Sequence, residues 1–148
     1  MALLTRKVDY AILVLNYLHR HTEGGCAREI ADRFRLSRAF VANILKELCQ
    51  KGFVVSHRGV KGGYALLRPA SEVSLANLLD ALDDQPISLA ACNESPAGDG
   101  CSLYADCPVK GPIAEVHQRL RDVLRGVTLG DLFHTRQPAG TELLTLGI

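Results

Sequence analysis

Apolar residues recur every three or four positions along most of the chain, the spacing of helices that bury one face. We predict a first helix over about residues 2–20, whose apolar face comprises Val8, Ala11, Ile12, Leu15 and Leu18. A short second helix follows the TEGG break at residues 22–25 and carries Ala27, Ile30, Ala31 and Phe34. A third helix, with Ser37 as its N-cap and Gly52 as its end, carries Phe40, Val41, Ile44, Leu45 and Leu48.

The pattern then changes to that of extended chain. Two runs rich in β-branched and aromatic residues, 53–57 and 64–67, flank a Gly-rich basic connection, which predicts a β-hairpin. Ser74 caps a further helix, whose apolar stripe comprises Leu75, Leu78, Leu79 and Leu82. Pro112 is placed to be the first residue of a last, long helix. Its apolar residues form a narrow heptad-like seam of Ile113, Val116, Leu120, Val123 and Val127.

These elements predict a mainly α-helical fold with a small β-hairpin, namely a winged helix-turn-helix domain followed by a long C-terminal dimerisation helix. We expect the winged helix-turn-helix over residues 1–84 and a cysteine-bearing loop over 85–111. The dimerisation helix and a short following segment are expected over 112–132, and a loose tail over 133–148. Packing within its own chain is the alternative for the seam, but heptad spacing and the two-fold symmetry of helix-turn-helix dimers favour a homodimer.

Composition adds little beyond the class of protein. The 148 residues are 47% hydrophobic and 22% charged, which is ordinary for a soluble globular chain. No apolar run approaches the roughly 18–20 residues that a membrane span needs. The N-terminal stretch has no small-residue cleavage pattern of a secretory signal, so we expect a cytoplasmic protein with no membrane partner.

The net charge of +1 conceals a strong asymmetry along the chain. Residues 1–70 carry 12 Lys and Arg against 5 Asp and Glu, whereas residues 71–108 carry 7 acids and no Lys or Arg. A basic first half favours contact with a polyanion. The candidate DNA contacts lie on the exposed face of the third helix and at the hairpin tip: Arg38, Ala39, Ala42, Asn43, Lys46, Arg58 and Lys61. A protein-binding winged helix with a solvated basic face is the alternative.

Three of the five cysteines lie in an irregular stretch rich in Gly, Pro, Asn, Asp and Ser. Cys92, Cys101 and Cys107 have the spacing C-x8-C-x5-C. In a reducing compartment, spaced cysteines point to a metal or redox group rather than to disulfides. Three thiolates are one ligand short of a complete iron–sulfur or closed zinc site. We expect Cys26 and Cys49 to be small, partly buried residues outside that site.

Three segments resemble the Rrf2 family of winged-helix regulators, in particular its cluster-binding branch that includes IscR, NsrR and RirA. They are LTRKVDYAI near the start, LSRAFVANILKELCQKGFV in the third helix and HRGVKGGYALLRP in the hairpin, and the similarity extends over about residues 1–132. The resemblance implies a homodimer that binds short, roughly palindromic DNA operators. It also implies an iron–sulfur cluster, with 4Fe–4S favoured and 2Fe–2S possible. Ala39, Ala42 and Asn43 match base-facing positions of the family and Arg58 matches the arginine of the wing, but Ala42 replaces a glutamate of IscR, so no operator sequence is assigned.

The resemblance also bears on the missing ligand. IscR uses a histidine three residues after its last cysteine, a position that Lys110 occupies here. NsrR-like proteins use an N-terminal aspartate contributed by the partner chain, and Asp9 matches it. Asp9 could instead simply suit the helix dipole of the first turn. His117 lies further along the last helix, with no assigned partner.

The predicted function is a homodimeric regulator whose operator binding is controlled by a cluster that senses nitric oxide, oxygen or redox state, or iron. One alternative keeps DNA binding but replaces the cluster by zinc or by thiol oxidation. Another is an iron–sulfur or redox partner protein that does not bind DNA. We do not expect an enzyme, because the sequence has no nucleophile–base pair, no phosphate-binding glycine loop before a helix and no paired carboxylates.

Overall fold

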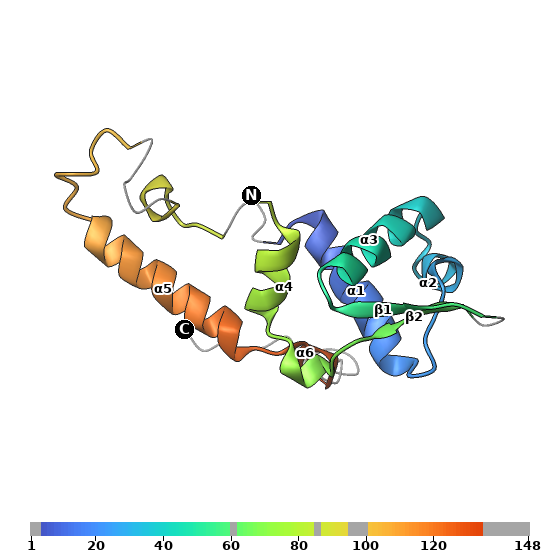
Figure 1. Ribbon diagram of the computed structural model, residues 1–148. Helices are drawn as coiled ribbons and strands as arrows, with labels where there is room; N and C mark the ends of the chain where they lie inside the picture. The colour runs from blue at the N-terminus through green and yellow to red at the C-terminus, as the bar shows by residue number, and fades with distance from the viewer. Residues whose placement is uncertain (1–3, 60–61, 85–86, 95–100, 135–148) are drawn as a thin grey trace, which may run out of the picture.

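The computed structural model describes residues 4–59, 62–84, 87–94 and 101–134. A winged-helix body is followed by a long helix that projects from it, with the cysteine-bearing segment at the outer end of that helix (Figure 1). Along the chain, the elements are α1 (Arg6–Arg20), α2 (Ala27–Phe34), α3 (Arg38–Gln50), β1 (Val54–His57), β2 (Gly63–Leu66), the 3-10 turn η1 (Ala70–Glu72), α4 (Leu75–Leu82), the 3-10 turn η2 (Ala91–Asn93), α5 (Lys110–Gly126) and α6 (Leu129–His134). The predicted fold class is confirmed.

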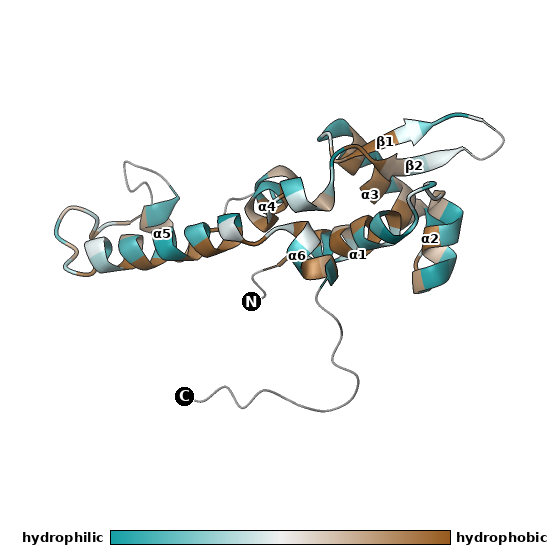
Figure 2. Ribbon diagram, turned by 90° about the horizontal axis from the view of Figure 1, so that it is seen from below, coloured by the Kyte–Doolittle hydropathy of each residue, from teal (hydrophilic) through white to brown (hydrophobic). Residues whose placement is uncertain are grey.

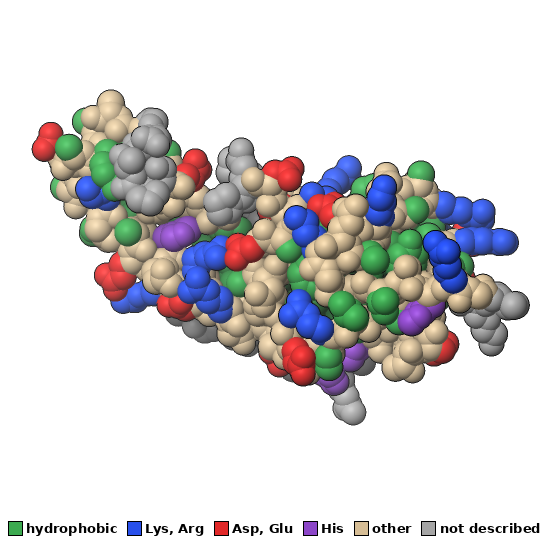
Figure 3. Space-filling model, in the orientation of Figure 1, with side chains coloured by type: hydrophobic (Ala, Val, Ile, Leu, Met, Phe, Trp, Pro, Cys, Tyr) green, Lys and Arg blue, Asp and Glu red, His purple; other side chains and the backbone are tan. Residues whose placement is uncertain are grey.

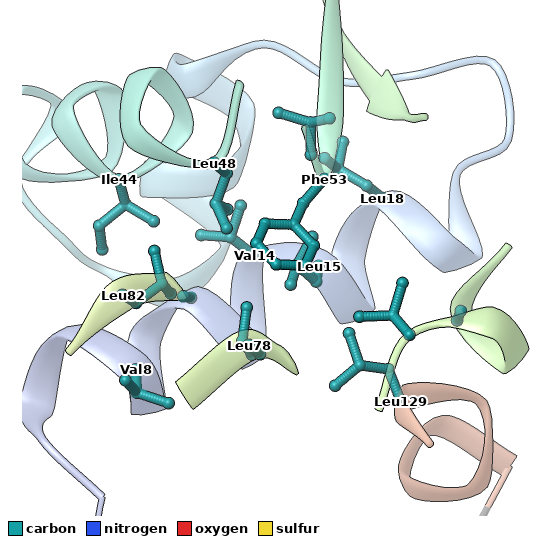
Figure 4. Close-up of a cluster of buried hydrophobic side chains, with 14 of the residues drawn as sticks. Val8, Val14, Leu15, Leu18, Ile44, Leu48, Phe53, Leu78, Leu82 and Leu129 are labelled. Carbon is teal, nitrogen blue, oxygen red and sulfur yellow. The ribbon is translucent and has the colours of Figure 1, made fainter. Parts of the chain in front are cut away.

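Helix α1 forms the centre of the body. It begins after Thr5, whose hydroxyl accepts a hydrogen bond from the Val8 amide at 3.4 Å. Its buried face packs against α3, α4, α6 and β2 and comprises Val8, Ala11, Val14, Leu15 and Leu18. Figure 4 shows these side chains meeting those of α3, α4 and α6 in one continuous core. Burial of this apolar surface is the main force that holds the body together.

The helix-turn-helix has the limits that the sequence predicts. Leu36 N donates to Ala31 O at 2.9 Å, and Arg35 takes a left-handed conformation (φ 55°) to end α2. Ser37 then caps α3, because its hydroxyl accepts from the Phe40 amide at 3.4 Å. Gly52, with φ 81°, ends the helix in a conformation that favours glycine. Helix α3 is thereby fixed at both ends.

The wing is an antiparallel pair of strands whose register runs from Val54 opposite Leu66 to His57 opposite Gly63. Its base is joined to the segment before α2 by an isolated bridge between Gly25 and Tyr64. A Cβ at Gly63 would lie 2.7 Å from Gly25 O, so this contact requires glycine. The wing is therefore anchored to the helix-turn-helix rather than only to its own neighbours.

The last helices differ from the prediction in two ways. Helix α5 begins at Lys110, two residues before Pro112, because proline is tolerated anywhere in a first turn whose amides lack helical partners. The predicted loose tail from residue 133 is wrong for residues 133–134, since α6 extends to His134 and Phe133 is 8% exposed. Thr128 and Asp131 cap that helix reciprocally, with Thr128 N donating to the Asp131 carboxylate at 2.9 Å and Asp131 N to the Thr128 hydroxyl at 3.0 Å. The rest of the predicted tail lies outside the described residues.

Candidate nucleic-acid interface and cysteine centre

The outer face of α3 carries four exposed residues of the predicted DNA-contacting set, Arg38, Ala39, Asn43 and Lys46, with Ala42 half-buried beside them. Figure 3 shows that Lys and Arg side chains gather at the end of the molecule formed by α2, α3 and the hairpin. The opposite face of α3 is buried in the core through Val41, Ile44, Leu45 and Leu48. This arrangement leaves a small, polar and basic surface on a rigid helix, the form of surface that enters a major groove.

The position of α3 is fixed from behind by α1. Lys7 Nζ donates to Glu47 Oε1 at 3.1 Å, and the rings of Tyr10 and Phe40 meet edge to face with centroids 5.2 Å apart. Edge-to-face aromatic pairs add to the free energy of apolar burial. These contacts hold the exposed face of α3 in a defined orientation.

An acidic residue lies at the start of this surface. Asp32 is 3.5 Å from the Arg38 guanidinium and 3.9 Å from that of Arg28, and all three side chains are more than half exposed. Exposed ion pairs of this kind stabilise a fold by about 1 kcal/mol at most. Arg38 can therefore exchange Asp32 for a phosphate group at little cost.

The wing presents Arg58, which is exposed, next to Gly59. Gly59 has φ 143°, and its carbonyl accepts a hydrogen bond from Gly62 N at 2.9 Å. Lys61, the other predicted wing contact, lies outside the described residues. The described part of the wing thus carries one of its two predicted cations.

We use the word arm for the described residues 87–94 and 101–126, which comprise η2, the segment before α5, and α5 itself. The three clustered cysteines lie on two separate pieces of this arm. Cys92 is in η2, whereas Cys101 and Cys107 lie on the segment that leads into α5, and all three thiols are half-buried. Successive turns shape that segment, with Tyr104 N donating to Cys101 O at 3.2 Å and Lys110 N to Cys107 O at 3.5 Å. The sequence spacing is thus folded into turns rather than into a regular element.

Lys110, at the position where IscR has its histidine, holds these turns together. Its ammonium donates to Tyr104 O at 3.1 Å and lies 4.1 Å from the centroid of the Tyr104 ring. The ammonium has no lone pair to offer a metal while it is protonated. Lys110 therefore shapes the cysteine segment instead of completing a ligand set.

Within the part of the chain that the structure describes, no three His, Cys, Asp or Glu side chains are grouped so as to hold a metal ion. The donor types nevertheless fit an iron–sulfur cluster, since accessible thiolates are its usual ligands. Asp9 is exposed in the first turn of α1, and its carboxylate makes no hydrogen bond or ion pair to another described residue. The single chain provides the donors without assembling them.

Two buried polar atoms in the arm lack hydrogen-bond partners: Nδ2 of Asn93, next to Cys92, and Nδ1 of His117 in α5. Each such atom costs about 1–3 kcal/mol relative to a paired one. Sequence reasoning missed Asn93 altogether, although its place directly after a predicted ligand is a usable signal. The sequence analysis named His117 but assigned it no interaction partner. Cys26 and Cys49, predicted to lie outside the site, are both half-buried. Cys26 is the N-cap of α2, and Cys49 lies in the last turn of α3.

The predicted seam on α5 is only partly covered. Val116 and Val123 are 53% and 62% exposed, while Ile113, Leu120 and Val127 are half-buried. Val109, 56% exposed, extends the same three–four spacing by one more step and was missed because it precedes the predicted helix. Leu124, on the inner face, is the one α5 residue buried among those described. An apolar row thus remains open along the outer face.

The inner face of α5 is held to α4 by a two-pronged ion pair. The Arg121 guanidinium donates to both carboxylate oxygens of Asp80, at 2.8 and 2.9 Å. This hydrogen bonding lowers the pKa of Asp80, against the opposing effect of burial, and raises the pKa of Arg121. The pair fixes the inner half of α5 to the body.

The described helices include none with the length and apolar character that crossing a bilayer requires.

Comparisons with known proteins agree with this geometry. The Rrf2 family, described as an iron-dependent transcriptional regulator, matches residues 4–135. Protein aau3 of Rhizobium meliloti (strain 1021) is 32% identical over 134 residues, covering 90% of this chain and 86% of that protein. The structure of T. potens IscR matches with a TM-score of 0.68 at 24% identity, covering 95% of this chain and 93% of IscR. CymR of B. subtilis, described as the global cysteine regulator, matches with a TM-score of 0.67 at 21% identity over 90% of this chain and 97% of CymR. At these identities the two structures bear on the fold alone, whereas the match over residues 4–135 establishes that the chain belongs to the Rrf2 family of transcriptional regulators.

Proposed function

We propose that the protein is a homodimeric, DNA-binding regulator whose operator binding is controlled by an iron–sulfur cluster on the arm. The observation that carries this proposal is the position of three half-buried thiols at the outer end of α5, away from the packed core. Thiols used only for packing are normally enclosed in a core. Thiols on an arm outside the core suit a sensor, and the family to which the chain belongs is described as an iron-dependent transcriptional regulator.

The DNA contacts follow from the exposed face of α3. Asn43 can read an adenine edge, Arg38 and Lys46 can reach guanine or phosphate, and the small residues Ala39 and Ala42 allow close approach to the major groove. Arg58 and Lys61 of the wing then lie against the minor groove, whose negative potential attracts cations. Two such units, related by a two-fold axis, match a palindromic operator.

The second subunit is proposed to cover the open seam of α5. Val109, Val116 and Val123 recur every seven residues, which keeps them on one face of a paired helix. Pairing of the two α5 helices removes these half-exposed side chains from water. It also sets the distance between the two α3 helices.

The ligands proposed for the cluster are Cys92, Cys101, Cys107 and the partner's Asp9. A 4Fe–4S cluster is favoured and a 2Fe–2S cluster is possible; when bound, it supplies iron that reacts with nitric oxide and oxygen and depends on iron supply. The carboxylate of Asp9 is a weaker, harder ligand than a thiolate, so it leaves one position readily exchanged. Because Asp9 lies on α1 of the DNA-binding body, its engagement orders the body of one subunit against the arm of the other. Operator affinity then depends on whether the two α3 helices can bind both half-sites of the operator at the same time.

The deciding experiment is anaerobic purification with visible absorbance and iron and sulfide counts, on wild type, Cys101→Ser and Asp9→Ala. We expect a coloured wild type with about four irons and four sulfides per chain for the 4Fe–4S form. Cys101→Ser should lose the cluster, and Asp9→Ala should alter its spectrum and speed its loss in air. Asp106→Ala, a matched change of an exposed acid next to Cys107, should resemble wild type. A colourless, iron-free wild type refutes the cluster, and zinc without sulfide establishes the zinc alternative instead.

DNA binding needs its own test, because it can hold without the cluster. An operator selected from random DNA should be bound by the wild type and lost by Asn43→Ala and Arg58→Ala, each weakening binding by about 1–3 kcal/mol. Lys46→Ala should weaken all sequences alike and reduce the salt dependence by about one ion. Arg119→Ala, an exposed cation on α5, is the control for loss of charge alone. Failure to enrich any sequence would favour the redox-partner alternative.

A further inference from the structure

The two unpaired polar atoms of the arm belong to elements that contact each other. Asn93 ends η2, and His117 lies midway along α5; η2 packs against α5. Figures 1 and 2 both show η2 lying beside the outer half of α5. Asn93 Nδ2 and His117 Nδ1 are buried and lack protein partners.

The two atoms are also complementary in chemistry. The side-chain amide of asparagine donates through Nδ2, and a neutral imidazole accepts through Nδ1 when its proton is on Nε2. His117 lies one turn before Arg121, and Asp80 holds Arg121 to α4, so this face of α5 points inward rather than into solvent. One hydrogen bond between the pair would remove two unsatisfied groups at once.

We propose that a local adjustment of η2 on α5 brings Asn93 Nδ2 within hydrogen-bond reach of His117 Nδ1, so that the amide donates to the ring, and that this pair is the latch that positions Cys92. Cys92 immediately precedes Asn93 in the three-residue turn, so fixing the Asn93 side chain fixes the direction of the neighbouring thiol. His117 is on this view a positioning residue rather than a ligand. The hydrogen bond between Asn93 and His117 needs no cluster. Only its role in positioning Cys92 as a cluster ligand rests on the proposed function.

The latch has a consequence for signalling. It ties the first cysteine directly to α5, while Asp80 and Arg121 tie the same helix to the body one turn further on. A displacement of Cys92 is thus passed to α5 next to its proposed contact with the second subunit. The other two cysteines lack this connection, because the turns before α5 hold them instead.

The latch can be tested on the metal-free, full-length protein by the alkylation rate of each cysteine. His117→Gln moves the acceptor away from the Nδ1 position and Asn93→Leu removes the donor, whereas His117→Asn keeps an acceptor near that position. We expect Cys92 to react about fivefold faster in the first two variants, the change in opening equilibrium set by loss of one hydrogen bond. His117→Asn should stay within about twofold of wild type on the same scale. Cys26 serves as the internal reference, and Gln118→Ala as the control for a change on α5.

A second readout asks where the ring proton lies. Nitrogen-15 NMR of the metal-free protein should show His117 with a bare Nδ1 and a protonated Nε2. A proton on Nδ1, or unchanged Cys92 reactivity in both His117→Gln and Asn93→Leu, overturns the latch. The latch is also overturned if the cluster shows hyperfine coupling to a nitrogen and this coupling disappears in His117→Asn, because His117 would then be a cluster ligand. If the wild type binds no iron, the proposed function fails while the alkylation rates still decide the latch.

Discussion

Helix α1 buries five of its 15 residues, whereas α5, with 17 residues, buries only Leu124. Helix α1 contacts α3, α4, α6 and β2, and its buried side chains are at most 2% exposed. Helix α5 contacts α4 at one end and η2 at the other, and leaves Val116 and Val123, together with its N-cap Val109, more than half exposed. Among the described residues, α1 is packed on several sides, whereas α5 leaves an apolar row exposed.

The difference between the two helices shows that the arm, unlike the body, leaves apolar and polar groups without packing or hydrogen-bond partners among the described residues. A long helix with an apolar row open to water is unstable by itself, because most helical stability in proteins comes from packing of that row. The same region holds three half-buried thiols and two unpaired polar atoms. Under the proposals above, a second α5 covers the apolar row, a cluster uses the thiols, and the latch pairs the two polar atoms. The body needs none of them.

The largest effect is expected from a cavity in the body. Leu78 of α4 is fully buried, and Leu78→Ala should lower the free energy of unfolding by about 3 kcal/mol. Leu103 in the arm is 68% exposed, and Leu103→Ala should change it by about 0.5 kcal/mol or less. Urea unfolding followed by circular dichroism measures both. Equal effects of the two changes would show that the arm is packed as tightly as the body.

The same contrast explains how far the sequence could predict the fold. In the body, each helix buries its apolar face against other parts of the same chain, so periodicity and caps such as Ser37, Ser74 and Gly52 placed the elements correctly. Helix α6 was missed, although Thr128 and Asp131 have the spacing of a capping box. Six residues are too few for a periodic pattern to stand out.

The site was less predictable, for a physical reason. The exposed face of α3 could be derived, since it is the complement of a buried face. Asn93 and the Asp80–Arg121 pair depend on which distant segments meet, and no local pattern reports that. Asp9 came from a resemblance only, and it remains a proposal because its predicted contact lies in another chain.

The next largest effect concerns the open seam. Val123→Ala removes two methyl groups from each subunit, and we expect it to weaken dimerisation by about 2 kcal/mol, or roughly 30-fold in Kd. Its thermal stability as a monomer should hardly change, because Val123 is 62% exposed there. Sedimentation over a concentration series measures the Kd. Gln118→Ala, on another face of α5, is the control, and a dimer unaffected by Val123→Ala would place the interface elsewhere.

A smaller effect is expected where the arm joins the body. Asp80 is 44% exposed and Arg121 16%, so loss of their pair in Arg121→Met should cost about 1 kcal/mol of unfolding free energy near neutral pH. The pKa of Asp80 is lowered from its ordinary 3.8, so the stabilisation is complete above that value and is lost as the pH falls through the lower, folded pKa. The difference between Arg121→Met and wild type should therefore be constant above about pH 5 and shrink in stronger acid.

A double-mutant cycle separates this pair from simple loss of packing. Asp80→Asn alone and Arg121→Met alone should each destabilise, and the double variant should cost less than their sum. Arg119→Met is the matched control, since its partner Glu115 lies in the same helix and both side chains are well exposed. Additive effects of Asp80→Asn and Arg121→Met would mean that α5 is held to α4 by apolar contacts alone.

The smallest effect is expected where α6, which follows α5, packs back against α1 of the body. The ring of His19 in α1 packs against Phe133 and His134, with centroids 5.3 and 5.4 Å away. Burial, and to a lesser extent His134 and Arg20, lower the pKa of His19 below its ordinary 6.5. The unfolded chain then takes up a proton at a higher pH than the folded chain, so stability is complete above about pH 6.5 and declines as the pH falls below it. Between about pH 7.5 and 5.5 we expect His19→Gln to remove on the order of 2 °C of the acid-induced drop in Tm. An unchanged pH dependence in His19→Gln would show that α6 packs on α1 without sensing the charge of that ring.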